Sequence, residues 1–133
     1  MMYMLDTNIC IYAIKNKPEQ VLRRIKSNMR NGLCVSVITL AELEHGVQKS
    51  LYPEKNAMAL IQFLAVLEVL PFDDLAAVEY GKLCAYLQKR GTPIGTMDML
   101  IAAHAKVENA VLVTNNVREF KRVPGLTIEN WAE

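Results

Sequence analysis

The stretch MYMLDTNICIYAI, residues 2–14, changes character twice along its length. The short apolar run Tyr3-Met4-Leu5 is followed by the polar triplet Asp6-Thr7-Asn8, after which residues 9–14 are apolar again. A short apolar run with a polar boundary is typical of a buried strand, and Asp, Thr and Asn all favour the first position of a helix. The stretch therefore predicts a buried strand that ends at Asp6 and a buried helix that follows it.

The same alternation continues along the chain. Further strands are predicted at residues 33–37, 69–70, 110–114 and 126–128, and helices at 18–29, 39 to about 46–50, 53–67, 73–90 and 97–107. Strands that alternate with helices favour an α/β sandwich around a mainly parallel sheet, whose functional site lies at the carboxyl ends of the strands. Residues 1–133 are expected to form a single domain, and Asp6 and Asn115-Asn116 each follow a strand end.

Three carboxylates lie among apolar residues: Asp6 after the first strand, Glu42 after Ile38-Thr39-Leu40-Ala41, and Asp98 after Ile94 and Met97. Charged groups in apolar surroundings are costly unless something compensates their charge, and a shared divalent cation compensates several at once. Mg²⁺ and Mn²⁺ bind carboxylate oxygens and activate water for attack on phosphodiesters. The first hypothesis is therefore metal-dependent phosphodiester hydrolysis.

Glu42 also has a purely structural interpretation. Thr39 followed by Glu42 three residues later is the pattern of a capping box at a helix start. His45 and His104 are left out of the candidate site: no second histidine marks a zinc pair with His45, and His104 lies about 240° around its helix from Asp98.

Composition narrows the class of protein. The chain has 133 residues, of which 52% are hydrophobic, and no run of about eighteen apolar residues that would span a membrane. Cys10, Cys34 and Cys84 are odd in number and widely spaced, which favours buried, reduced thiols and a cytoplasmic location.

The net charge of +1 hides an uneven distribution. Residues 1–34 carry six basic and two acidic side chains, whereas residues 35–80 carry two basic and seven acidic ones. A basic first third is suited to face a polyanion. The alternative is that Arg23, Arg24, Lys26 and Arg30 simply solvate one helix face.

Four motifs then occur in a particular order: MLDTN at 4–8, TLAEL at 39–43, GTMD at 95–98 with IAAHA at 101–105, and LVTNN at 112–116. Together they closely resemble the VapC family, the PIN-domain ribonuclease toxins of bacterial type II toxin–antitoxin modules. The resemblance covers essentially the whole chain. It implies an α/β/α sandwich and a Mg²⁺- or Mn²⁺-dependent endoribonuclease, with Asp6, Glu42 and Asp98 as the three core acids of the metal site.

The resemblance also implies partners. These are an RNA substrate such as tRNA, a second copy of the chain in a homodimer, and a small VapB-like antitoxin that forms a hetero-oligomer with the toxin. An antitoxin arginine is expected to pair with the carboxylates, and the helical stretch 57–67 to supply a groove or dimer surface for an amphipathic helix.

The chain departs from the family pattern at one position. Asn116 stands where the family often has a fourth acid, and Glu119, about one helical turn later, is the candidate replacement. The alternative is that Glu119 is an exposed acid beside Arg118 and Lys121. Four neighbours are predicted either to orient the acids and the scissile phosphate or merely to cap helices: Thr7, Asn8, Thr114 and Asn115.

Two rival functions follow from these departures. With its fourth acid altered, the chain could be a catalytically weak module that binds RNA or protein. A phosphohydrolase with Asp6 as nucleophile would need a second aspartate where Asn8 stands.

Overall fold

A sheet of five parallel strands forms the centre of the computed structural model, which describes residues 2–133. The strands are β1 (Tyr3–Leu5), β2 (Leu33–Ser36), β3 (Glu68–Leu70), β4 (Val111–Val113) and β5 (Ile128–Glu129), in the spatial order β3-β2-β1-β4-β5. Met4 of the central strand pairs with Cys34 on one side and Leu112 on the other. The predicted α/β fold with a mainly parallel sheet is confirmed.

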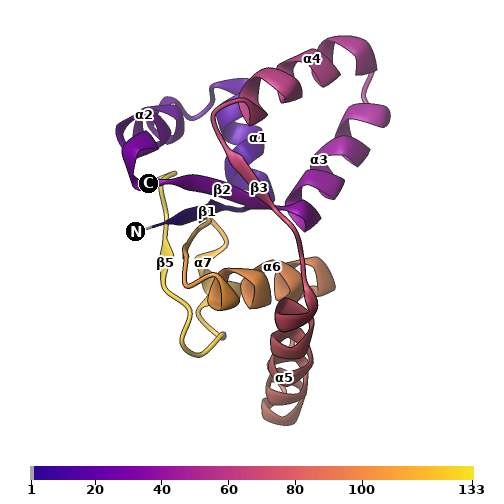
Figure 1. The fold of residues 1–133 in the computed structure, drawn as a ribbon, viewed down its shortest axis with the longest axis vertical. Coiled ribbons are helices and arrows are strands. Elements are labelled where there is room, and N and C mark those ends of the chain that lie inside the picture. The colour runs from indigo at the N-terminus through magenta and orange to yellow at the C-terminus, as the bar shows by residue number, and fades with distance from the viewer. Residues whose placement is uncertain (1) are drawn as a thin grey trace.

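Helices cover both faces of this sheet (Figure 1). They are α1 (Thr7–Lys15), α2 (Glu19–Ser27), α3 (Val37–Gln48), α4 (Pro53–Leu64), α5 (Asp74–Arg90), α6 (Thr96–Val107) and α7 (Val117–Phe120), with a 3-10 turn at Met29–Asn31. One core packs α1 to α4 against the sheet and the other packs α5 to α7 against its opposite face.

The alternation of strand side chains decides which core each residue joins. Met4 and Leu112 point into the core under α5 and α6, whereas Leu5 and Val113 point into the core under α1 to α4. Both faces of the central strands are therefore buried, as expected of a parallel sheet with helices on both sides.

The start of α3 differs from the prediction. Ser36, not Thr39, is the N-cap, because its hydroxyl accepts a hydrogen bond from the Ile38 N–H at 3.0 Å. The strand ends one residue earlier than expected, and Thr39 is a buried residue inside the helix. The predicted capping box between Thr39 and Glu42 is wrong, so capping does not explain Glu42.

Three other boundaries shift by a few residues. The helix predicted at 53–67 ends at Leu64, the helix predicted at 18–29 ends at Ser27, and the last strand occupies Ile128–Glu129. In α1, Ile9, Cys10 and Ala13 are buried, but the residues on its other face are only half-buried, contrary to prediction. The half-buried residues Ile11 and Ile14 on that face border a groove described below.

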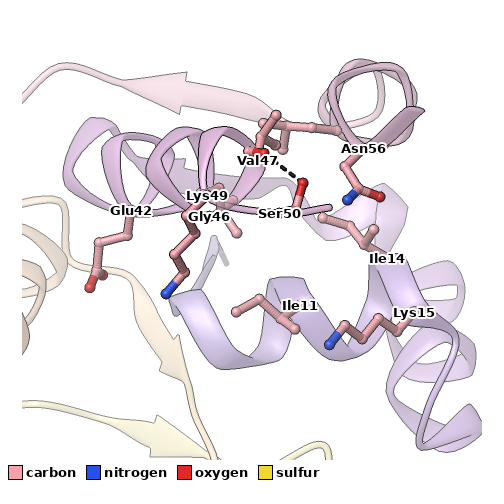
Figure 2. Close-up of a pocket in the computed structure, with 11 residues that line it drawn as sticks. Ile11, Ile14, Lys15, Glu42, Gly46, Val47, Lys49, Ser50 and Asn56 are labelled. Carbon is pink, nitrogen blue, oxygen red and sulfur yellow. Dashed lines mark hydrogen bonds between the residues drawn. The ribbon is translucent and has the colours of Figure 1, made fainter. Parts of the chain in front are cut away.

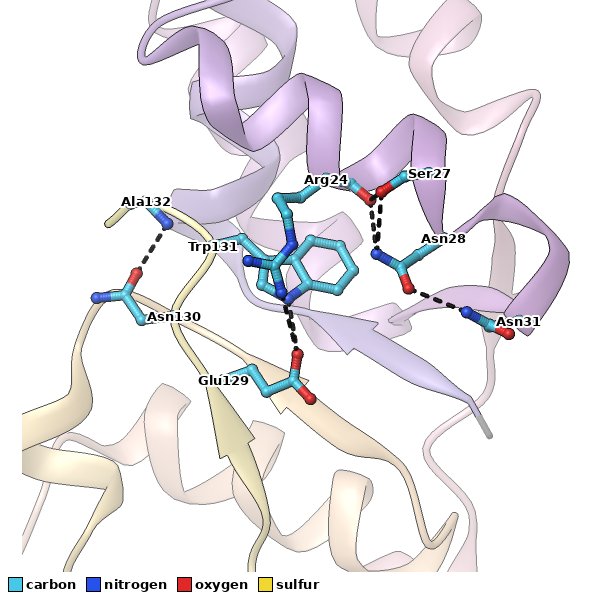
Figure 3. Close-up of polar contacts among 8 residues, drawn as sticks. All are labelled: Arg24, Ser27, Asn28, Asn31, Glu129, Asn130, Trp131 and Ala132. Carbon is cyan, nitrogen blue, oxygen red and sulfur yellow. Dashed lines mark hydrogen bonds and ion pairs between the residues drawn. The ribbon is translucent and has the colours of Figure 1, made fainter.

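The C-terminal segment is fastened to the start of the sheet by Trp131 (Figure 3). Trp131 is fully buried, lies 5.2 Å from the Tyr3 ring between centroids, and donates from Nε1 to Glu129 Oε1 at 2.9 Å. The guanidinium of Arg24 on α2 covers the indole at 5.3 Å and pairs with Glu129. Part of the basic first third therefore packs on the C-terminus.

The three cysteines are unpaired thiols, as predicted. Cys10 and Cys34 are buried, and burial raises the pKa of the Cys34 thiol to about 12, whereas Cys84 is only half-buried. Within residues 2–133, no helix has both the length and the apolar character needed to cross a membrane.

Candidate active site

Four acidic side chains come from four different helices at the carboxyl edge of the sheet. Asp6 caps α1 directly after β1, Glu42 lies in the second turn of α3, Asp98 in the first turn of α6, and Glu119 in α7 after β4. The carboxyl ends of parallel strands lie at the same edge of the sheet. The topology therefore brings together residues that are more than a hundred positions apart in the chain.

Asp6 is the most buried of these acids, with 5% of its surface exposed. Its Oδ1 accepts from the Ile9 N–H at 2.9 Å, which fixes the carboxylate at the first turn of α1. Burial, with a smaller contribution from the charge of Glu42, raises the pKa of Asp6 from 3.8 to about 6, although hydrogen bonds from Thr114 and Ile9 oppose the shift. The protein thus holds this carboxyl where its charge is poorly compensated.

Glu42 is oriented by Thr7. The Thr7 hydroxyl donates to Glu42 Oε1 at 2.6 Å and lies 3.5 Å from the Thr39 hydroxyl. The bond joins the first residue of α1 to α3 across 35 positions of sequence. Thr39 was predicted only as a helix cap, and its place beside Thr7 follows from its spacing of three residues before Glu42.

Asn116 lies between the remaining two acids. Its amide nitrogen donates to Glu119 Oε2 at 3.1 Å and approaches Asp98 Oδ2 at 3.4 Å. Burial and the neighbouring Glu119 carboxyl raise the pKa of Asp98 to about 7, and the charges of Asp6 and Glu42 add to the shift. The four acids therefore share one region of negative potential, with Glu119 inside it rather than on a remote surface.

The other predicted neighbours have different surroundings. The Thr114 hydroxyl accepts from the Asn116 N–H at 2.9 Å, which shapes the turn after β4. Asn115 donates to the Tyr12 hydroxyl at 2.8 Å and so faces α1, while Asn8 is exposed on α1. His45 is exposed, and His104 is buried against Ser36 rather than against the four acids.

The donors at this edge suit a hard cation, since carboxylate and amide oxygens are what Mg²⁺ and Mn²⁺ bind. Across residues 2–133, no three acidic, histidine or cysteine side chains stand close enough to enclose an ion as they are now placed. Glu42 is instead bonded to Thr7, and Asn116 separates Asp98 from Glu119. The donor chemistry fits a divalent metal, although the side chains do not converge on one point in this structure.

A groove of about 350 Å³ leads away from the acids between α1, α3 and α4 (Figure 2). Its floor is apolar, from Ile11, Ile14, Leu43, Val47 and Leu60, and Glu42 lies at one end. Lys15 and Lys49 line it as well. Lys49 is the C-cap of α3, seven residues and about two helical turns after Glu42, so it lies on the same side of that helix.

This fold with acids at the carboxyl edge of its sheet is that of a PIN domain, whose family model matches residues 3–126. The chain is 49% identical to the tRNA(fMet)-specific endonuclease VapC of Salmonella typhimurium over 129 residues, with 97% of each chain covered. It is 47% identical to Ribonuclease VapC2 of Rickettsia felis over 132 residues, with 98% of each covered.

Solved structures of VapBC proteins contain chains with the same fold. The structure of VapBC2 from Rickettsia felis bound to a DNA fragment from their promoter contains a chain that matches with a TM-score of 0.94 and 45% identity, over 98% of this chain and 99% of that one. The DNA-bound VapBC of Salmonella typhimurium matches with a TM-score of 0.93, at 48% identity and 98% coverage of both chains. The chain belongs to the VapC family of PIN-domain ribonucleases, the toxins of type II toxin–antitoxin modules. The predicted family, fold and nuclease class are confirmed, and the phosphohydrolase alternative is not supported.

Proposed function

We propose that this chain is a divalent-metal-dependent endoribonuclease that acts as a single domain and hydrolyses phosphodiester bonds in RNA. The observation that carries the proposal is the convergence of Asp6, Glu42, Asp98 and Glu119 at the carboxyl edge of the sheet. Burial, and secondarily the neighbouring carboxylates, raise the pKa of Asp6 and Asp98 there, so their charges lack a compensating partner. Such crowding destabilises the metal-free protein locally, and a bound cation relieves it.

Asp6, Glu42 and Asp98 are the residues proposed to hold Mg²⁺ or Mn²⁺, and Glu119 is proposed to supply the fourth acid in place of Asn116. A divalent ion bound there would activate water and neutralise charge on the scissile phosphate. The chain's own residues then have distinct roles. Thr7 fixes the rotamer of Glu42, and Asn116 spaces Asp98 from Glu119 and can turn its carbonyl inward.

Three neighbours complete the proposed site. Thr114 is a positioning residue, because its hydroxyl holds both the Asn116 backbone and the Asp6 carboxylate. Asn115 ties the same turn to Tyr12 on α1. Asn8 is exposed next to Asp6, which makes it the candidate to contact a phosphate of the RNA.

Structured RNA of the tRNA class is the proposed substrate. Its support is the full-length likeness, at 49% identity, to a relative named as specific for tRNA(fMet). The buried, unpaired thiols support action in the reducing cytoplasm.

The apolar groove is proposed to receive an amphipathic helix of a VapB-like antitoxin. Leu60 of α4, within the stretch predicted to form such a surface, lines it. Neither Lys15 nor Lys49 forms an ion pair within residues 2–133, so both are available to acidic residues of a partner. An antitoxin arginine at the Glu42 end would compensate the carboxylates in place of a metal.

A homodimer is proposed to form on a different surface. Leu75 and Val78, about one turn apart at the start of α5, are large apolar side chains that are 64% and 58% exposed. Such clustering is typical of a protein interface. Light scattering should show a dimer that Val78→Glu converts to a folded monomer.

The catalytic proposal is tested with Asp6→Asn and Asp98→Asn in an RNA cleavage assay with Mn²⁺. Both variants keep side-chain size while removing a charged ligand, so cleavage should be lost while the circular dichroism spectrum is retained. Asp73→Asn, the same change at the exposed cap of α5, is the matched control and should cleave normally. Normal cleavage by both site variants would overturn the assignment. RNA binding without cleavage by the unmodified chain would favour the binding-module alternative.

A further inference from the structure

Beyond the acids themselves, one buried polar contact joins the two helices that carry Glu42 and Asp98. His104 Nδ1 lies 2.8 Å from Ser36 Oγ, across 68 positions of sequence. Both side chains are completely buried. A buried polar pair of this kind costs desolvation and persists because its partners satisfy each other.

The second hydrogen bond of Ser36 indicates which partner donates in this contact. Ser36 Oγ already accepts from the Ile38 N–H as the cap of α3, so its hydroxyl hydrogen is free to donate to His104 Nδ1. Burial lowers the pKa of His104 and so favours the neutral imidazole, whereas the charges of Glu108 and Asp73 and a hydrogen bond with the Pro71 backbone oppose that shift. When Nδ1 is the acceptor, the ring hydrogen is on Nε2, which has no hydrogen-bond partner of good geometry within residues 2–133 and only a weak interaction with the Pro71 backbone.

An unpaired buried Nε2 shows that the ring is not placed to satisfy all its own polar atoms. Phe72 meets the ring edge-on at 5.4 Å between centroids, and Glu108 Oε1 is 3.9 Å from Nε2, beyond hydrogen-bonding distance. The retained bond is the one to the first residue of α3. An apolar side chain of similar size would avoid the cost of burying Nε2.

The Ser36–His104 contact lies at similar sequence distances from two of the proposed metal ligands, Glu42 and Asp98. Glu42 lies six residues after Ser36, and Asp98 lies six residues before His104. Six helical residues span about 9 Å. The Ser36–His104 bond therefore fixes the start of α3 against the second half of α6. Each of these helices carries one carboxylate at a similar distance along the helix from that bond.

We propose that His104 is a positioning residue that sets the separation of Glu42 and Asp98 through its hydrogen bond to the Ser36 hydroxyl. The inference rests on the proposed metal site. It assigns a functional role to a histidine that touches neither the acids nor the substrate.

The test is direct Mn²⁺ binding by calorimetry and electron paramagnetic resonance, with thermal unfolding measured in parallel. His104→Leu fills the space but removes the acceptor, and its Mn²⁺ affinity should fall by roughly 10- to 100-fold, as for residues that orient metal ligands. His104→Asn places an amide near the Nδ1 position and should recover most of the affinity. Val21→Ala, a buried change on α2, should lower the melting temperature without changing Mn²⁺ affinity.

Several results would overturn the role. They are wild-type Mn²⁺ affinity in folded His104→Leu, an equal loss in Val21→Ala, or no recovery in His104→Asn. Should His104→Leu fail to fold, Ser36→Ala removes the same bond from the other end and should weaken Mn²⁺ binding at least as much, because it also removes the cap of α3. Asp98→Asn separates the two proposals. Normal Mn²⁺ binding by Asp98→Asn as well would mean that the proposed metal site is wrong. Loss of Mn²⁺ affinity in Asp98→Asn but not in His104→Leu would refute only the positioning role of His104.

Discussion

Asp6 is subject to two effects, helix capping and burial, that favour opposite charge states of its carboxyl group. As the cap of α1 it accepts a hydrogen bond from Ile9, which favours the carboxylate, yet its burial beside Glu42 favours the neutral acid. Burial is the larger effect, because the pKa rises to about 6 in spite of the hydrogen bonds. A residue selected for stability alone would be an asparagine here, since Asn caps helices as well as Asp and carries no charge.

Asp6→Asn should therefore stabilise the metal-free protein at neutral pH. The folded-state pKa is raised above the unfolded value, so the carboxylate destabilises the fold above about pH 6, and this cost disappears as the pH falls towards 4. A shift of about two pKa units corresponds to roughly 2–3 kcal/mol. Urea unfolding in EDTA at pH 7.5 and 4.5 should show a clearly larger gain at the higher pH. An equal gain at both pH values would mean that charge is not the cause.

Asn116 and Glu119 allow a second comparison at this scale. Glu119→Gln should raise the Mn²⁺ concentration needed for half-maximal cleavage, because it removes one of the proposed ligands. Asn116→Asp should lower that concentration while destabilising the metal-free protein, since a third carboxylate would then face Asp98 and Glu119. Manganese titrations of the three proteins measure both effects, and an unchanged Glu119→Gln would return that residue to a surface role.

At the scale of elements, local patterns placed strands and helices well but misjudged competing caps. Ser36 and Thr39 are both good N-cap residues, and only the packing of Ser36 under α6 selects the first. The acids were identifiable because each interrupts an apolar run beside a strand or helix end. Their arrangement was not, since the Thr7–Glu42 and Ser36–His104 bonds join residues 35 and 68 positions apart.

The C-terminal segment depends on a single anchor of this non-local kind. Trp131→Ala should cost about 3–5 kcal/mol, because it empties a fully buried site against Tyr3 and removes the partner of Glu129. Arg24→Ala should cost less than about 1 kcal/mol, since the Arg24–Glu129 pair is largely solvated. Guanidinium unfolding of the two variants tests the ranking. Similar losses would assign the anchoring to the ion pair.

For the whole molecule, Glu42 links the two features, because it belongs to the acid cluster and also lines one end of the groove. A partner that occupies the groove can therefore reach the carboxylates, which links inhibition to the catalytic edge. The fold class and nuclease activity followed from motifs in sequence order. The groove was predicted only on the stretch 57–67, because its other walls belong to α1 and α3, whose approach to α4 is set by the core that packs α1 to α4 against the sheet.

Expression of this chain alone should arrest growth and cleave cellular RNA, and co-expression of the small protein encoded beside it should restore growth. Ile14→Glu places a charge on the half-buried groove wall, so it should remain toxic but escape rescue. Met58→Glu is the matched control, since Met58 is exposed on α4 and does not line the groove; it should be toxic and rescued. Growth curves and RNA 5′-end sequencing distinguish the outcomes. Rescue of Ile14→Glu would move the antitoxin to another surface, whereas normal growth with intact RNA under strong expression of the unmodified chain would favour a binding module over a toxin.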